Sequence, residues 1–178
     1  FAKNQCGFLP SRSTTLQMPG FLDVLTKAVD VGKEVDVVYT DLEKAFDKIP
    51  HKKLLYKLER YKVNEQVLRW IGSYLKYRTF RVRLNGVCSE ALQVESGVPQ
   101  GSVLGPLLFL IYINDIYTVC ESMFLFADDA KLFRVLGSRE DCFRLQNNIN
   151  GVVEWFNRWQ MQVNIGKCCL LHVGESIS

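Results

Sequence analysis

The sequence predicts a mixed α+β fold with antiparallel strands, and three observations lead to that class. The β-rich run Val35–Asp41 is typical of a strand, and the two short apolar runs within Met123–Phe133 are typical of a hairpin. Elsewhere, apolar residues recur three and four positions apart, which indicates helices. The predicted order is strand, helices, hairpin, helix, hairpin, helix and strand, and 178 residues suffice for one domain with a sizeable core.

The composition is that of an ordinary globular protein, with 48% hydrophobic and 23% charged residues. No apolar run approaches the roughly 20 residues that a membrane span needs, and no signal peptide opens the chain. The first residue is Phe1 rather than Met, so we expect a segment of something longer. The six cysteines form no C-x-x-C pair and have no histidine at zinc-finger spacing, which favours reduced thiols in an intracellular protein over disulfides or zinc.

The first predicted helix follows Ser13, which can cap it, and continues to about Gly32. Its Pro19-Gly20 pair conflicts with a helix interior, because proline there costs roughly 3 kcal/mol or more. Either a new helix begins at Pro19 or the helix is kinked there. The predicted buried face comprises Phe21, Leu22, Leu25 and Val29.

Two more helices and a hairpin are predicted before residue 95. The helices show apolar residues at helical spacing, the second one after an Asn64 cap: Leu54, Leu55, Leu58 and Tyr61, then Val67, Leu68, Ile71 and Leu75. The hairpin runs from Phe80 to Val94 around Asn85-Gly86, the dipeptide favoured in type I′ turns.

The remaining elements follow a polar, glycine-rich loop, Ser96–Ser102. The apolar run Val103–Ile113 is too short for a membrane span and predicts a buried helix. A last helix is capped by Ser138 and has one apolar face, formed by Leu145, Ile149, Val152 and Phe156. Gln162–Val173 then alternates like a closing strand.

Basic residues are concentrated between Lys44 and Arg83, where twelve Lys and Arg stand against three acids. Tyr and Trp are interleaved with these charges, a composition that suits a polyanion partner. We expect much of the charge on the outer faces of the two predicted helices. A merely solvated helix face explains the same pattern equally well.

The adjacent carboxylates Asp128 and Asp129 lie at or beside the tip of the hairpin within Met123–Phe133. Two ionised carboxylates side by side repel each other and lose hydration, and a divalent cation removes that penalty. An acidic turn in solvent is the alternative for an isolated pair. Asp41, however, ends another predicted strand, and carboxylates from adjacent strands are what a two-metal phosphoryl-transfer site requires.

Several long motifs, in the right order, resemble one known family. They are VYTDLEKAFD (38–47), SGVPQGSVLGPLLF (96–109), YIND (112–115), FADD (126–129), the opening GFLPSRST (7–14), and Trp155, Trp159, Gln160, Met161, Asn164 and Lys167. Over nearly its whole length the chain is similar to the reverse transcriptase of non-LTR (LINE-type) retrotransposons. Within that group it resembles the jockey and CR1-like elements.

The resemblance implies the α+β fold of a right-hand polymerase. Its palm would be a ferredoxin-like (RRM-like) antiparallel sheet with helices on one face, and part of the fingers would accompany it. Fingers and fingers–palm elements would occupy about residues 1–34 and 51–95, and the palm 35–50 and 96–178. The chain would lack the thumb and the endonuclease of such elements.

The resemblance also implies roles for eight residues. Asp41 and Asp128 would be the principal metal ligands, with Asp129 beside them. Phe46, five residues after Asp41, matches the position whose ring excludes a ribose 2′-hydroxyl, although a core aromatic is the competing explanation. Lys167 matches a lysine proposed to protonate the pyrophosphate, and an exposed structural lysine is the alternative.

The other three implied residues contact the nucleotide. Arg12 matches a fingers arginine that grips the triphosphate, where a guanidinium fork suits phosphate oxygens. Gln100 and Gly101 match the loop that abuts the incoming nucleotide and the template base. Glycine suits that loop because its backbone can approach a ligand closely.

The implied activity is that of an RNA-directed DNA polymerase that adds dNTPs to a primer 3′-hydroxyl with two Mg²⁺ ions, or Mn²⁺ in their place. The implied partners are template RNA, a DNA primer or nicked target DNA, dNTPs and the rest of a parent polyprotein, with no membrane partner. The expected location is the nucleus and cytoplasm of a eukaryote.

Two other functions are weighed against this one. A catalytically silent, nucleic-acid-binding remnant of a decayed element would keep the basic surface without turnover. Two departures from related sequences favour such a decayed copy. One is the pair Pro19-Gly20, and the other is Cys6 and Ser11 in place of the usual histidine and glycine. A nucleotide cyclase with a similar palm is disfavoured by the Gln100-Gly101 loop.

Overall fold

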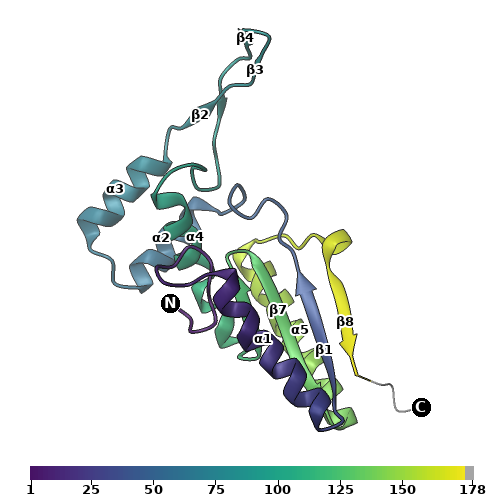
Figure 1. The fold of residues 1–178 in the computed structure, drawn as a ribbon. Coiled ribbons are helices and arrows are strands. Elements are labelled where there is room, and N and C mark those ends of the chain that lie inside the picture. Colours follow the sequence, from purple (N-terminus) through teal and green to yellow (C-terminus); the bar gives the residue numbers. More distant parts are fainter. Residues whose placement is uncertain (175–178) are drawn as a thin grey trace. The chain divides into compact units, whose positions relative to one another are not determined.

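The structure is a computed structural model that describes residues 1–174 (Figure 1). It comprises two compact units. The first contains Phe1–Glu43 and the chain from Ile113 onward, and the second contains Lys44–Tyr112. The mixed α+β class predicted from the sequence is confirmed.

The first unit is built on a four-stranded antiparallel sheet. Its strands, β1 (Glu34–Thr40), β6 (Met123–Phe126), β7 (Asp129–Leu136) and β8 (Cys169–Val173), lie in the order β6-β7-β1-β8. The central β1 pairs with β7 on one side and β8 on the other, and its Val35 and Val37 are completely buried. The hairpin predicted around the two aspartates is therefore β6–β7, and the predicted first strand is β1.

Helix α1 (Thr14–Asp30) covers one face of this sheet. It starts as predicted, because the Ser13 side chain accepts a hydrogen bond from the N–H of Leu16. It continues through Pro19, so no new helix begins there. Phe21 and Ala28 are buried against β1.

The predicted apolar face of this helix is only partly right. Phe21 is buried and Leu25 packs against the same cluster, but Leu22 and Val29 are exposed. Each of these two residues follows a buried position by one, and one residue turns the helix by about 100°. They therefore point away from the sheet, and Ala28 takes the place expected of Val29.

Helix α5 (Arg139–Trp159) covers the opposite face. The neighbours of Arg134 along β7 face α1, so the Arg134 side chain points to the opposite face of the sheet. There its guanidinium forms an ion pair with Asp141 of α5 at 3.6 Å. The sheet thus has helices on both faces, not on one as expected, because α1 precedes β1 and adds a second layer (Figure 1).

The ends of α5 and β8 also differ from the prediction. Ser138 is the N-cap residue, but its side chain caps no helical N–H. Instead, the carboxylate of Asp141 accepts from the N–H of Gly137 and from the Ser138 hydroxyl. The closing strand begins only at Cys169, since a short 3₁₀ helix, Ile165–Lys167, occupies the chain before it.

The second unit contains helices α2 (His51–Arg60), α3 (Glu65–Leu75) and α4 (Leu104–Ile113, whose last residue is counted with the first unit). An exposed arm connects α3 to the following loop. It has two short ladders, β2 (Thr79–Phe80) with β5 (Leu92–Gln93) and β3 (Arg83–Leu84) with β4 (Val87–Cys88). Asn64 caps α3, and Asn85 and Gly86 both have positive φ, as a type I′ turn requires.

One basic residue of α2 is not on its outer face. Lys57 is buried, and its ammonium donates a hydrogen bond to the backbone oxygen of Tyr112. The same ammonium nitrogen lies 4.8 Å from the centre of the Tyr112 ring. Lys57 is thus an exception to the expectation that much of the basic charge lies on outer helix faces, since Lys52, Arg60 and Arg69 are exposed. A cation buried in this way needs such partners, because desolvation penalises its charge.

All six cysteines, which lie within residues 1–174, are free thiols. No helix in the described part of the chain is long and apolar enough to cross a bilayer.

Candidate active site

Asp41 and the Asp128-Asp129 pair come to the same end of the sheet. Thr40 at the end of β1 pairs with Ala130, and Phe126 pairs with Asp129 across the two-residue turn between β6 and β7. Asp41 is the first residue after β1, so it lies beside that turn. The register thus places the three aspartates that the sequence indicated at one end of the sheet.

Asp128 has an unfavourable environment for a negative charge. Burial raises the pKa of this carboxyl above its ordinary value, and the charges of Asp129 and Asp41 raise it further. A backbone hydrogen bond and the ammonium of Lys167 act in the opposite direction. A carboxylate held in this way gains from a nearby cation.

Asp41 has the second feature of a cation site. Its Oδ2 atom is buried and has no hydrogen-bond partner among residues 1–174, although the Lys167 ammonium lies 3.4 Å away in an ion pair. The backbone oxygen of Asp41 accepts from the N–H of Asn164, which fixes the segment that carries Lys167. An anionic oxygen that is buried without a hydrogen bond fits a hard divalent ion such as Mg²⁺.

Asp129 is placed differently from the other two. It is exposed and lines a small cavity of about 100 Å³ with Phe126 and Lys131. Within residues 1–174, no three Asp, Glu, His or Cys side chains converge as a ready-made metal site. The case for a cation therefore rests on the buried Oδ2 atom of Asp41 and on the raised pKa of Asp128. The negative charge of Asp129 contributes to that raised pKa.

The turn that carries Asp128 is held by residues that the sequence analysis did not select. The carbonyl oxygen of the buried Gln5 side chain accepts from the N–H of Ala127 at 3.0 Å and from the N–H of Gly7 at 2.8 Å. Any side chain at Gly7 would collide with the backbone of Ala127. A glutamine two residues before a glycine does not predict this contact from the sequence, because only the fold shows that the glutamine is buried.

Arg12 contributes to the same N-terminal segment. One terminal nitrogen of its guanidinium donates to the backbone oxygens of Ala2, Lys3 and Gln5. The side chain is otherwise exposed. Arg12 thus orders the segment that holds the Asp128 turn, a structural role that the sequence did not predict.

Phe46, Gln100 and Gly101 belong to the second unit. The Phe46 ring is half-buried and stacks on Phe109, with centroids 4.4 Å apart. The loop that follows residue 95 is hydrogen-bonded to the segment around Phe46, because Val98 donates to the backbone oxygen of Phe46 and Gly97 to that of Ile49, both at 2.8 Å.

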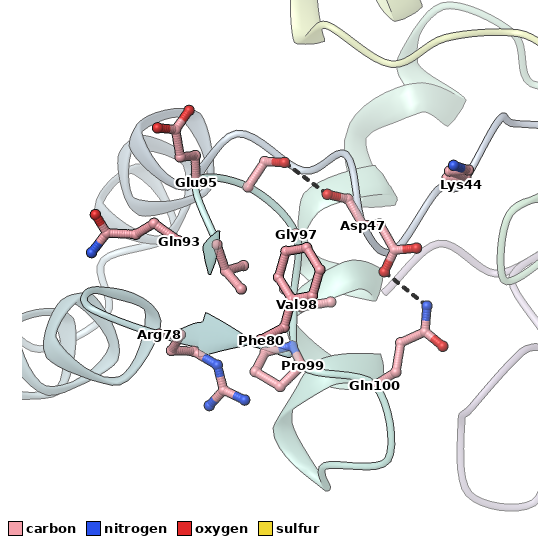
Figure 2. Close-up of a pocket in the computed structure, with 12 residues that line it drawn as sticks. Lys44, Asp47, Arg78, Phe80, Gln93, Glu95, Gly97, Val98, Pro99 and Gln100 are labelled. Carbon is pink, nitrogen blue, oxygen red and sulfur yellow. Dashed lines mark hydrogen bonds between the residues drawn. The ribbon is translucent and has the colours of Figure 1, made fainter. Parts of the chain in front are cut away.

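Gly97 allows this close contact between the two segments. Its φ is +85°, and a Cβ there would lie 2.6 Å from the backbone oxygen of Asp47. The Ser96 hydroxyl donates to the same oxygen, as the upper dashed line in Figure 2 shows.

Gln100 makes one specific side-chain contact, with Asp47. Its amide nitrogen donates to the Asp47 carboxylate at 2.8 Å, the lower dashed line in Figure 2. Gly101 is exposed with φ of +76°, which favours glycine. Asp47 was not selected from the sequence, although it stands within the motif that contains Asp41.

A model of the family described as reverse transcriptase (RNA-dependent DNA polymerase) matches residues 1–177. The chain belongs to the reverse transcriptase family. The match extends over both units, so the resemblance seen in the sequence motifs is confirmed.

Known reverse transcriptases of non-LTR retrotransposons are its relatives. The chain is 30% identical over 177 residues to the RNA-directed DNA polymerase from mobile element jockey of Drosophila funebris, a match that covers 93% of this chain and 19% of that protein. It is 29% identical over 172 residues to the probable RNA-directed DNA polymerase from transposon X-element of Drosophila melanogaster, with the same coverage. The chain thus spans about a fifth of the length of these relatives.

The fold is similar to that of a telomerase. The structure of telomerase from Candida tropicalis with the TWJ fragment of telomeric RNA matches with a TM-score of 0.70 and 13% identity, covering 98% of this chain and 31% of that one. At this identity the similarity shows the fold alone.

Proposed function

We propose that this chain is the catalytic core of an RNA-directed DNA polymerase that adds dNTPs to a primer 3′-hydroxyl. The observation that carries the proposal is the buried Oδ2 atom of Asp41, which lies at the same sheet end as Asp128. Among the described residues this atom has an ion pair with Lys167 but no hydrogen-bond partner. The raised pKa of Asp128 has its cause in burial and in the neighbouring carboxylates. Family membership and similarity to RNA-directed DNA polymerases support the proposed substrate class.

In this proposal Asp41 and Asp128 hold Mg²⁺, and Asp129 adds negative charge beside them. When bound, two such ions would activate the primer hydroxyl and stabilise the leaving pyrophosphate. Lys167 lies within ion-pair distance of Asp41 and donates a proton to the pyrophosphate.

The remaining residues bind the substrate. Arg12 binds the triphosphate through the guanidinium nitrogens that the backbone oxygens leave available. Phe46 excludes the 2′-hydroxyl of a ribonucleotide, and Gln100 and Gly101 contact the nucleotide and the template base. The sheet of the first unit would be a polymerase palm, and residues 1–34 and 51–95 would contribute fingers elements.

The proposed partners follow from the activity. They are template RNA, a DNA primer or nicked target DNA, dNTPs, and the thumb and endonuclease of a parent polyprotein. The place of action would be the nucleus and cytoplasm of the host cell.

Primer extension on an RNA template tests this proposal, with the parent polyprotein as the enzyme. We expect Mg²⁺-dependent DNA synthesis, and a loss of at least a hundredfold with Asp128→Asn, because the substitution removes a metal ligand's charge. Asp30→Asn, at an exposed position at the end of α1, is the matched control and should retain activity. Normal synthesis by Asp128→Asn would disprove the metal assignment, whereas template binding without any synthesis would favour the silent remnant.

A further inference from the structure

The second unit carries an exposed row of aromatic and basic side chains that none of the roles above uses. Trp70 and Tyr74 lie one turn apart on α3, with ring centroids 5.8 Å apart and planes 14° from parallel. The guanidinium of Arg78 lies 5.5 Å from the centre of the Tyr74 ring. We call these three residues the Trp70–Arg78 row. Trp70 is 55% exposed, so a large flat apolar surface faces solvent.

The charge around this row has one sign. Between Gln66 and Ser89 the chain has no acidic residue, and it has five basic ones: Arg69, Lys76, Arg78, Arg81 and Arg83. All five are exposed. Tyr77 and Phe80, which are 86% and 49% exposed, add further aromatic surface. Aromatic faces among positive charges are the features that bind unpaired nucleic-acid strands, since the bases stack and the phosphates pair with the charges.

The row leads into a cavity, because Arg78 also lines a pocket of about 640 Å³ (Figure 2). The Phe80 ring and the Gln100 side chain lie in the same pocket. Its charged side chains balance, two bases against two acids: Lys44 and Arg78, Asp47 and Glu95. A balanced pocket suits a neutral planar group with hydrogen-bonding edges better than it suits a phosphate, and a nucleobase is such a group.

We propose that an unpaired template strand follows the Trp70–Arg78 row, with its bases stacked on Trp70 and Tyr74, and enters the pocket that contains Gln100. A duplex does not fit this surface in the same way, because its bases are already stacked and their faces are hidden. The inference rests on the proposed function only in the identity of the ligand, which is the template strand of the proposed polymerase.

Binding of two primer–template duplexes tests the proposal, without metal or dNTP. One has a short 5′ overhang of uridines on the RNA strand and the other is blunt. We expect Trp70→Ala to weaken binding of the overhang duplex about five- to a hundredfold and to leave the blunt duplex unchanged. Trp70→Phe should keep most of the affinity. Phe143→Ala, which removes an exposed aromatic from α5, is the matched control and should change neither.

An abasic overhang separates stacking from charge. Trp70→Ala should have no effect on binding of an overhang that has the sugar-phosphate backbone but no bases. Arg78→Ala should reduce the slope of log K against log salt by about one, and Trp70→Ala should leave that slope unchanged. Equal losses on blunt and overhang duplexes, or no loss on either, would overturn the proposal.

These outcomes are independent of the polymerase activity. A protein that binds the overhang through Trp70 and never extends a primer would refute the proposed function while supporting this inference.

Discussion

Phe46 is half-buried and stacked on Phe109, so two explanations of this residue predict different outcomes. If the ring excludes a 2′-hydroxyl, Phe46→Val should raise the use of ribonucleotides relative to deoxyribonucleotides, with a modest loss of total activity. If the ring only packs, the substitution should lower stability by roughly 1–3 kcal/mol and leave sugar selectivity unchanged. Melting temperature and the ratio of rNTP to dNTP efficiency, measured on one purified variant, decide between them.

Asp47 fixes the orientation of the Gln100 amide through its hydrogen bond at 2.8 Å. Asp47→Ala removes the acceptor, so the Gln100 side chain is no longer held in one orientation. We therefore expect KM for dNTPs to rise several-fold. Asp47→Asn keeps a carbonyl acceptor and should retain most of the affinity. An equal rise of KM in both variants would show that the charge of Asp47, rather than the hydrogen bond, is what matters.

At the scale of elements, β8 is joined to β1 by a titratable pair. His172 forms a 2.7 Å hydrogen bond with Asp36, and this bond, with the charges of Asp36 and Glu34, raises the pKa of His172. Because the folded-state pKa is raised, the stabilisation is complete below the unfolded-state pKa of about 6.5. It is lost as pH rises through the raised folded-state value.

Thermal melts at acid and alkaline pH test this contribution of β8. We expect His172→Gln to lower the melting temperature below pH 6 and to have little effect above pH 8, since glutamine carries no charge at either pH. A difference that is the same at both pH values would mean that His172 acts by packing and not by its charge.

The sequence predicts most of the helices and strands, but it does not predict which side of each helix is buried. Ser13, Asn64 and Asn85-Gly86 act locally, through bonds or dihedral angles within a few residues, so their helix starts and turn are predicted correctly. The exposure of Leu22 and the burial of Lys57 depend on contacts with residues far away in sequence. Helical spacing alone does not distinguish two positions that are 100° apart.

At the scale of the whole molecule, the carboxylates of the candidate site were predicted from their strand-end positions, and the strand register places these positions at one end of the sheet. Their role as metal ligands stays a prediction. The residues that support them were not predicted. Gln5 acts on a turn more than a hundred residues later in the chain, and no local pattern indicates such a contact. The division into fingers and palm stays a prediction.

The pKa of Asp128 affects the stability of the molecule as a whole. Because this pKa is raised in the folded state, ionisation of Asp128 weakens the fold, and stability falls as pH rises from about 4 through the raised value. Asp128→Asn should therefore be as stable as the unaltered protein, or slightly more so, at neutral pH without Mg²⁺, and should lose this advantage below pH 4. Addition of Mg²⁺ should stabilise the unaltered protein and not the variant. Urea unfolding at two pH values, with and without Mg²⁺, measures both effects, and a clear loss of stability by the variant at neutral pH would contradict the assigned cause of the shift.

The ion pair between Lys167 and Asp41 has a consequence for the order of events at this site. The ammonium is a tethered counter-ion, so a divalent ion held by Asp41, as proposed, would compete with a charge that the protein itself supplies. Binding of the metal would then be an exchange that releases Lys167 from its ion pair. Lys167 would become available as a proton donor only after the metal is bound, which would link proton donation to the readiness of the enzyme to react.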